Sequence, residues 1–142
     1  MNEIARILII RGWPGCGKTH IAKLLKNEFG DNVRIFENND YFMRDENTYV
    51  FNKNEMNAAI LDCQDRVEEH VNRGGTAIVT NCFTKISHMD WFFDLAKRLN
   101  VTIDVINVVG NRQSPHFLPP ERLLQMKTNF ERGGFETIEN YK

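Results

Sequence analysis

Apolar positions along the chain change their spacing in a way that predicts alternating strands and helices. Residues 4–10 are apolar except for Arg6, which is typical of a strand buried on both faces of a parallel sheet. Residues 33–36 are β-prone and predict a second strand, followed by a polar cluster at 37–40. Between these strands the apolar residues have helical spacing and predict a helix with one buried stripe, formed by Ile21, Leu24, Leu25 and Phe29.

The same alternation continues through the rest of the chain. Residues 56–71 predict a second helix, and residues 76–80 predict a buried third strand. Residues 92–99 then predict a helix, and residues 101–106 a fourth strand. A last helix is expected from residue 120 onward, with four apolar side chains turned inward, namely Leu123, Leu124, Met126 and Phe130.

Three segments lack a steady period. Residues 41–54 mix aromatic and acidic side chains, and we expect a structured loop over a functional site. Residues 110–120 are rich in proline and predict a mobile loop, while residues 132–142 are expected to form a polar tail. The elements together predict a single α/β domain over residues 1–142, with a short, mainly parallel four-stranded sheet.

The connection between the first strand and the first helix has the spacing of a phosphate-binding loop. Four residues separate Gly12 from Gly17-Lys18-Thr19, which is the Walker A pattern. Glycines let backbone N–H groups point at a β-phosphate, Lys18 reaches the β- and γ-phosphate oxygens, and the hydroxyl of Thr19 can bind Mg²⁺. Because a strand precedes the loop and a helix follows it, we expect a nucleotide to bind at Gly12, Trp13, Pro14, Gly15, Cys16, Gly17, Lys18, Thr19 and His20.

The phosphate loop also narrows the predicted fold and the nucleotide. Its position after the first strand predicts a three-layer α/β/α P-loop NTPase domain. No guanine-reading Asn-Lys-x-Asp stretch occurs downstream, so ATP is expected rather than GTP. The expected cofactors are therefore ATP and Mg²⁺.

Composition limits the partners of this site. The chain has 142 residues, a formal net charge of −1 and three cysteines without CxxC spacing. The charge is mild evidence against a large polynucleotide partner, unless Arg and Lys form a local cluster. The cysteine usage fits a reducing compartment, and neither a membrane span nor a signal peptide is evident, so we expect a cytoplasmic protein without membrane contact.

An ordered set of motifs resembles one family. Residues 11–19 are followed by weaker motifs, namely Asp40-Tyr41-Phe42, Tyr49-Val50-Phe51, Asn81, Pro119-Pro120-Glu121-Arg122 and Met126. The set is similar to the small P-loop kinase-like group that includes the kinase domain of phage polynucleotide 5′-kinases and the related AAA_33-type domains. The likeness extends from about Ile4 to Glu131, which is nearly the whole chain.

The resemblance implies a reaction and a place for each reacting group. It implies transfer of the γ-phosphate of ATP·Mg²⁺ to a hydroxyl, with the 5′-hydroxyl of DNA or RNA as the preferred acceptor, and a central first strand flanked by the third and fourth. Asp40 is expected near the acceptor hydroxyl and, with Thr19, near Mg²⁺. Lys18 belongs to the catalytic set, and Arg112 or Arg122 is expected to stabilise charge on the transferred phosphoryl group.

Three positions depart from the pattern usual in that family. Asn39 stands where an aspartate usually activates the acceptor hydroxyl, and an amide cannot usefully accept a proton. Thr80 stands where an aspartate usually lies beside Mg²⁺, and Ile60 replaces a common histidine. All three changes fall on the acceptor side of the predicted site.

Three hypotheses for the function stay open. In the first, Asp40 or Glu37 takes the role of base and the protein is an ATP-dependent kinase of the polynucleotide-kinase type. In the second, the chain is a catalytically degenerate ATP-binding regulatory module. The third is a kinase of small molecules, such as nucleosides or amino sugars. We favour the first hypothesis because Lys18 and Thr19 are intact and an acidic residue remains beside Asn39.

Overall fold

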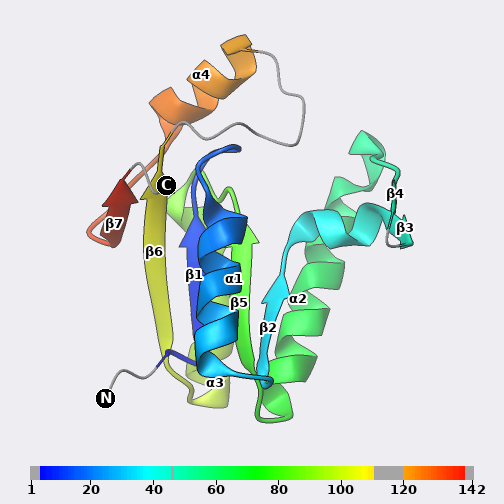
Figure 1. Cartoon of the computed structure of the whole chain (residues 1–142), viewed down its shortest axis with the longest axis vertical. Helices are drawn as coiled ribbons and strands as arrows, with labels where there is room; N and C mark the ends of the chain where they lie inside the picture. The colour runs from blue at the N-terminus through cyan, green and yellow to red at the C-terminus, as the bar shows by residue number, and fades with distance from the viewer. Residues whose placement is uncertain (1–3, 46, 111–119, 140–142) are drawn as a thin grey trace.

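The computed structural model describes residues 4–45, 47–110 and 120–139, and it contains a five-stranded parallel sheet with helices on both faces (Figure 1). All of the strand pairs in this sheet run parallel. In their order across the sheet, the strands are β2 (Val33–Phe36), β5 (Thr76–Asn81), β1 (Ile7–Arg11), β6 (Ile103–Val109) and β7 (Glu136–Glu139).

The first strand is central, as the resemblance implied, and β5 and β6 flank it. The expectation of four strands is wrong, because β7 adds a fifth at the edge, with Glu136 paired to Ile106. This strand lies in the segment expected to be a polar tail. Only Thr137 and Ile138 are half-buried in it, so the sequence pattern is too short and too polar to predict a strand.

The side chains of β1 alternate between two apolar layers, and this alternation explains the three-layer architecture. Ile7 and Ile9 pack on the face covered by α2 (Met56–Asn72) and α3 (Asp90–Leu99). Leu8 and Ile10 pack on the opposite face with α1 (Lys18–Phe29). Every residue of β1 is buried, and all but Arg11 at its end are apolar, as predicted for a central strand of a parallel sheet.

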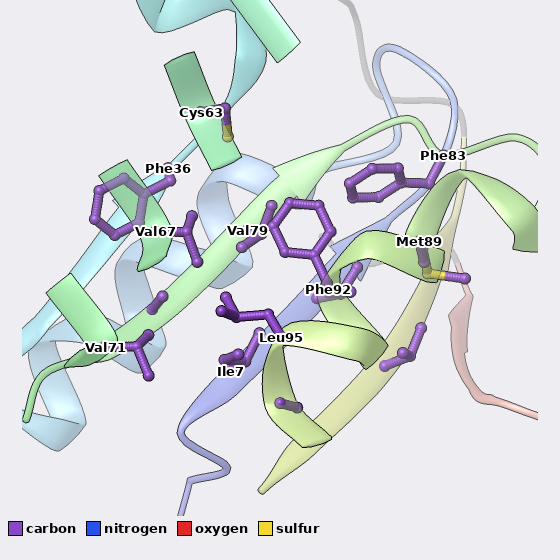
Figure 2. Packing of buried hydrophobic residues seen from close by; sticks show 14 residues of the cluster. Ile7, Phe36, Cys63, Val67, Val71, Val79, Phe83, Met89, Phe92 and Leu95 are labelled. Carbon is purple, nitrogen blue, oxygen red and sulfur yellow. The ribbon is translucent and has the colours of Figure 1, made fainter. Parts of the chain in front are cut away.

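The layer between the sheet and the helices α2 and α3 holds the buried side chains of Phe36, Phe83 and Phe92 (Figure 2). Phe83 and Phe92 meet edge to face, with ring centroids 5.7 Å apart. On α2, buried residues recur at a spacing of four, which places one face of the helix on the sheet, through Ala59, Cys63, Val67 and Val71.

The segment between β2 and α2, expected to be a structured loop, contains short regular elements. These are the 3₁₀ helix η1 (Asn38–Phe42), the antiparallel hairpin of β3 (Met43–Asp45) and β4 (Thr48–Tyr49), and the 3₁₀ helix η2 (Lys53–Glu55). Phe42 anchors the segment, because its ring is buried and touches those of Tyr49 and Phe51. A further 3₁₀ helix, η3 (Ile86–Met89), precedes α3.

Two leucines predicted to be buried are exposed. Leu24 of α1 is 47% exposed, and Leu124 of α4 (Pro120–Asn129) is 66% exposed. In α1 the buried face is narrow and centres on Ile21 and Ala22, so helical spacing alone assigned too wide a stripe. Among the helices in the described part of the chain, none is long and apolar enough to cross a membrane.

Candidate functional site

The phosphate loop lies at the carboxyl end of β1, between that strand and α1 (Figure 1). Gly17 ends the loop with φ of 104°, a left-handed conformation that favours glycine, and it is the N-cap residue of α1. No side chain caps this end of α1. Its first N–H groups therefore point out of the helix toward the loop, which is the arrangement that binds phosphate at a helix N-terminus.

Lys18 holds its ammonium group inside the loop. Its Nζ donates to the carbonyl oxygen of Gly12 at 2.7 Å and to that of Trp13 at 3.2 Å. The positive charge thus lies where loop N–H groups and the helix N-terminus would also attract phosphate oxygens. Next to it, Thr19 is exposed, and it lines a cavity that extends from the phosphate loop.

The groups near the loop fit Mg²⁺ bound together with a nucleotide better than a metal bound by protein alone. Within the described residues there is no cluster of three or more His, Cys, Asp or Glu side chains that could hold a metal ion. Mg²⁺ usually keeps several waters and uses few protein oxygens together with phosphates. The Thr19 hydroxyl at the start of α1 is a suitable oxygen donor for such an ion.

Trp13 anchors the phosphate loop to the helix α4. Its indole N–H donates to the carbonyl oxygen of Gly110 at 2.8 Å, and its ring meets that of Phe130 edge to face at 5.6 Å. The ammonium group of Lys127 on α4 lies 5.6 Å from the same ring. Because Trp13 is only 8% exposed, it packs beneath the loop instead of offering a free aromatic face.

Arg11 is a fully buried cation at the end of β1. Its guanidinium donates to the carbonyl oxygens of Phe83 and Glu131 and to the Oδ1 of Asn107, and it lies 4.2 Å from the ring centroid of Phe130. Burial lowers its pKa from the usual value of an arginine to about 10, although the negative charge of Glu131 opposes that shift. Arg11 therefore ties the chain that follows β5 and the chain that follows α4 to the base of the phosphate loop.

Polar groups at the carboxyl ends of β2 and β5 face the loop. Asn38 and Asn81 exchange hydrogen bonds, since the Asn38 N–H donates to Asn81 Oδ1 at 2.8 Å and Asn81 Nδ2 donates to Asn38 Oδ1 at 3.2 Å. The Thr80 hydroxyl donates to Glu37 Oε2 at 3.1 Å. These contacts join η1 to β5 and hold the Glu37 carboxylate at the edge of the sheet where parallel strands end.

Asp40, the carboxylate predicted to serve the acceptor, points elsewhere. Its Oδ2 accepts the backbone N–H of Glu37 at 3.2 Å, which closes the first turn of η1. The same oxygen lies 3.5 Å from Nη1 of Arg66, whose Nε pairs with Asp62 at 2.9 Å. Asp40 is not among the described residues that line the cavity, whereas Glu37 is.

One cavity of about 680 Å³ connects the phosphate loop to these polar groups. The volume lies within the range of small-molecule sites. On the phosphate side, its lining comprises Pro14, Gly15, Gly17, Lys18, Thr19 and His20. Gly12, Trp13 and Cys16, the other predicted loop residues, are buried beneath that surface.

The far wall of the cavity comes from α2, α3 and η3, and among its residues the sequence had placed only Ile60 on the acceptor side. Met56, Ile60 and Gln64 follow one another at a spacing of four on α2 and line the cavity together. Phe92 of α3 and His88 of η3 complete this wall. The expected place of Ile60 and the helical spacing together could have identified Met56 and Gln64, which lie one turn before and one turn after it.

The remaining predicted residues lie outside this cavity or outside the described chain. Arg122 is exposed on the outer surface of α4, together with Glu121 and Gln125. Arg112 falls within residues 111–119, which the structure does not describe. Cys82 lines the cavity, and burial raises the pKa of its thiol, so a thiolate is disfavoured at neutral pH.

Comparison with known proteins supports the assignment of the fold. A family model described as AAA_33, an AAA domain, matches residues 7–110. The fold is similar to that of a sugar kinase from a Janibacter species, with a TM-score of 0.64 and 16% identity over 96% of this chain and 84% of the other.

Two further solved structures share the fold. Kti12 from Chaetomium thermophilum, in complex with ADP-AlF3, has a TM-score of 0.62 and 12% identity over 94% of this chain and 88% of the other. A chain of a Pnkp1/Rnl/Hen1 complex has a TM-score of 0.60 and 14% identity over 88% of this chain and 40% of the other. At such identities the likeness establishes the three-layer fold with its mainly parallel sheet.

Proposed function

Because the chain belongs to the AAA_33 family, a family with the P-loop kinase fold, we propose that it is an ATP-dependent phosphotransferase that moves the γ-phosphate to a hydroxyl acceptor. One observation carries this proposal. A single cavity joins the phosphate loop on one side to the Glu37 carboxylate and the polar ends of β2 and β5 on the other. Donor phosphates and an acceptor hydroxyl can therefore meet within one cavity.

The donor half of the reaction rests on the loop and the start of α1. The N–H groups of the loop bind the β-phosphate, and Lys18 exchanges its hydrogen bonds to the carbonyls of Gly12 and Trp13 for β- and γ-phosphate oxygens. The Thr19 hydroxyl would hold Mg²⁺ together with phosphate oxygens and water. When bound, this ion neutralises charge that develops on the phosphate oxygens.

The acceptor half rests on Glu37. In the transfer step, a bond forms between the acceptor oxygen and the γ-phosphorus, and the bond from that phosphorus to the bridging oxygen of ADP breaks. The Glu37 carboxylate accepts the proton of the acceptor hydroxyl. The hydrogen bond from Thr80 orients this carboxylate. Asp40, which was expected to play this part, closes the η1 turn and faces Arg66.

Two arginines remain candidates for stabilising the charge on the transferred group. Arg122 lies in the first turn of α4. Arg112 belongs to residues 111–119, which precede that helix and lie outside the described residues. A cation brought over the γ-phosphate stabilises the spread negative charge of the transition state. We keep both as proposals for this role.

The competing proposal is a regulatory module that binds ATP without transferring phosphate. Asn39 and Thr80 favour it, because neither can accept a proton where related domains usually carry aspartate. For the kinase, two acceptors are at issue, the 5′-hydroxyl end of a nucleic acid and a small molecule.

The test is transfer of labelled phosphate from [γ-³²P]ATP by the purified full chain with Mg²⁺. Acceptors should include 5′-hydroxyl DNA and RNA, nucleosides and sugars. We expect Lys18→Ala to lower transfer at least about 100-fold through lost phosphate stabilisation. Lys23→Ala is the matched control, because Lys23 is exposed on the same helix outside the cavity lining. ATP binding without transfer to any acceptor would favour the regulatory module.

A second variant separates the two carboxylates. Glu37→Gln keeps the size of the side chain but removes the proton acceptor, so kcat should fall by about 10²- to 10⁴-fold with little change in the KM for ATP. An unchanged kcat in Glu37→Gln would refute the role of Glu37 as base.

A further inference from the structure

The acceptor side of the cavity carries few charges. Among the described residues that line the cavity, Lys18 is the only lysine or arginine and Glu37 the only carboxylate. Two histidines, His20 and His88, are the other groups there that can become cationic. The Nδ1 of His88 accepts a hydrogen bond from the backbone N–H of Lys85 at 3.4 Å, so this ring nitrogen is already engaged within the chain.

The one lysine belongs to the donor side. Its Nζ is 2.7 Å from the Gly12 carbonyl oxygen, inside the loop where phosphate groups of the donor bind. Its charge is therefore compensated by the donor and is not available to the acceptor. Glu37 remains across the cavity, held by Thr80 at 3.1 Å, so a second anion placed beside it would meet repulsion.

The rest of the acceptor wall combines neutral amides with apolar side chains. Asn39 at the end of β2 and Gln64 on α2 offer amide donors and acceptors, which pair with hydroxyl groups. Met56, Ile60 and Phe92 provide an apolar surface. Such a wall suits a ligand with hydroxyl groups on one side and an apolar ring face on the other.

We infer that the acceptor is an uncharged small molecule that carries hydroxyl groups beside an apolar ring face, as nucleosides and sugars do, and that anionic acceptors, including nucleic-acid ends, are excluded. This inference takes the phosphoryl-transfer reaction from the proposed function. The class of ligand is inferred separately, from the residues that line the acceptor side of the cavity. Among the described residues of the acceptor wall, no lysine or arginine is placed to pair with a phosphate or carboxylate, and this observation, together with the Glu37 charge, argues against anions.

The experiment compares acceptors that differ by one charged group. Adenosine is paired with adenosine 3′-monophosphate, which has the same base and the same 5′-hydroxyl. Glucose is paired with glucose 1-phosphate, which has the same ring and the same 6-hydroxyl. For each pair, phosphoryl transfer is measured with the full chain, ATP and Mg²⁺ at pH 8. In parallel, binding is measured by the thermal shift of the chain with Mg²⁺ and a non-hydrolysable ATP analogue.

We expect at least one neutral member to be preferred over its anionic partner on the order of 100-fold in kcat/KM and to give the larger thermal shift. Gln64→Lys places a cation on the acceptor wall and should narrow this preference at least about 10-fold. Gln125→Lys makes the same substitution on the outer surface of α4 and should leave the preference unchanged.

The two readouts separate failure of this inference from failure of the proposed function. An anionic member that binds and reacts as well as or better than its neutral partner overturns the inference while leaving the kinase proposal intact. Preferential binding of a neutral member without any transfer supports the ligand class and overturns the kinase proposal. If neither pair binds nor reacts, the inference is wrong.

Discussion

Substitution of Gly12 by alanine should damage stability, because the backbone of β6 lies against this residue. A Cβ atom at position 12 would be 2.2 Å from the carbonyl oxygen of Val108 and 2.7 Å from the Sγ of Cys16. Since Cβ atoms essentially never come closer than 3.0 Å to another heavy atom, the loop or the strand must move by about 0.8 Å. A backbone atom cannot change rotamer, so we expect the free energy of unfolding to fall by about 2–3 kcal/mol.

The same shift should weaken ATP binding. The carbonyl oxygen of Gly12 accepts a hydrogen bond from Lys18 Nζ at 2.7 Å and so helps to place the ammonium group. Displacement of a positioned group by about 1 Å can cost roughly 100-fold in function. We therefore expect the Kd for ATP to rise at least about 10-fold.

Urea unfolding followed by circular dichroism and calorimetric titration with ATP measure the two effects. The control is Gly134→Ala, because a Cβ there meets no atom within 4 Å and the residue has no positive φ. That variant should change the unfolding free energy by less than about 0.5 kcal/mol. If Gly12→Ala unfolded at the same urea concentration as Gly134→Ala and kept its ATP affinity, the steric reasoning would be refuted.

Three further predictions concern Arg11, Asp40 and Cys63. Arg11→Met leaves the Asn107 Oδ1 and the carbonyl oxygens of Phe83 and Glu131 without this donor. The free energy of unfolding, measured in urea, should therefore fall by about 3 kcal/mol. The control is Arg98→Met at the exposed pair with Glu68, which should lower it by under about 1 kcal/mol. Asp40→Asn weakens the η1 turn and the ion pair with Arg66, so the free energy of unfolding should fall by about 1 kcal/mol. The same variant should lower kcat far less than Glu37→Gln does. If Asp40→Asn lowered kcat more than Glu37→Gln, Asp40 would be the base. Burial raises the pKa of the Cys63 thiol from 9.0 to about 11. Between these pH values the folded chain keeps a proton that the unfolded chain releases. The free energy of unfolding should therefore fall by up to about 2 kcal/mol between pH 9 and 11. Cys63→Ala should lack that decline, and an identical pH profile in both proteins would contradict the assigned cause.

Local patterns in the sequence predicted the central features of the fold. The apolar run of β1 and the glycine spacing of the phosphate loop each depend on a few consecutive residues, and the fold contains both where they were expected. By contrast, β7 depends on pairing with β6, a strand about 30 residues earlier in the chain, and contributes only two half-buried side chains. Local pattern carries little information about such a strand.

The choice between two neighbouring carboxylates illustrates a second limit. Glu37 and Asp40 both follow β2, and the sequence placed both at the end of that strand. Which one meets the cavity depends on the 3₁₀ turn of η1, which directs Asp40 to Arg66 on α2 and leaves Glu37 beside Thr80. The direction of these two carboxylates therefore depends on contacts between three separate elements. The spacing of residues within one element does not predict it.

Arg11 shows the same limit for the core. An arginine at the end of a strand would ordinarily be assigned to the surface. Here the side chain is fully buried because carbonyl oxygens from two distant segments, at Phe83 and Glu131, converge on it. The acceptors become neighbours only after the sheet and α4 are in place.

The central place of β1 has a consequence for synthesis of the chain on the ribosome. Ile7 pairs with Ala77 on one side and with Ile103 on the other, so both partners are made long after the strand itself. At translation rates of about 5–20 residues per second, several seconds pass between the synthesis of β1 and that of β5, the first strand with which it pairs. All of its residues are buried in the finished protein. We therefore expect nascent chains that stop before β5 to aggregate or to bind holding chaperones, while chains that extend beyond β6 do not.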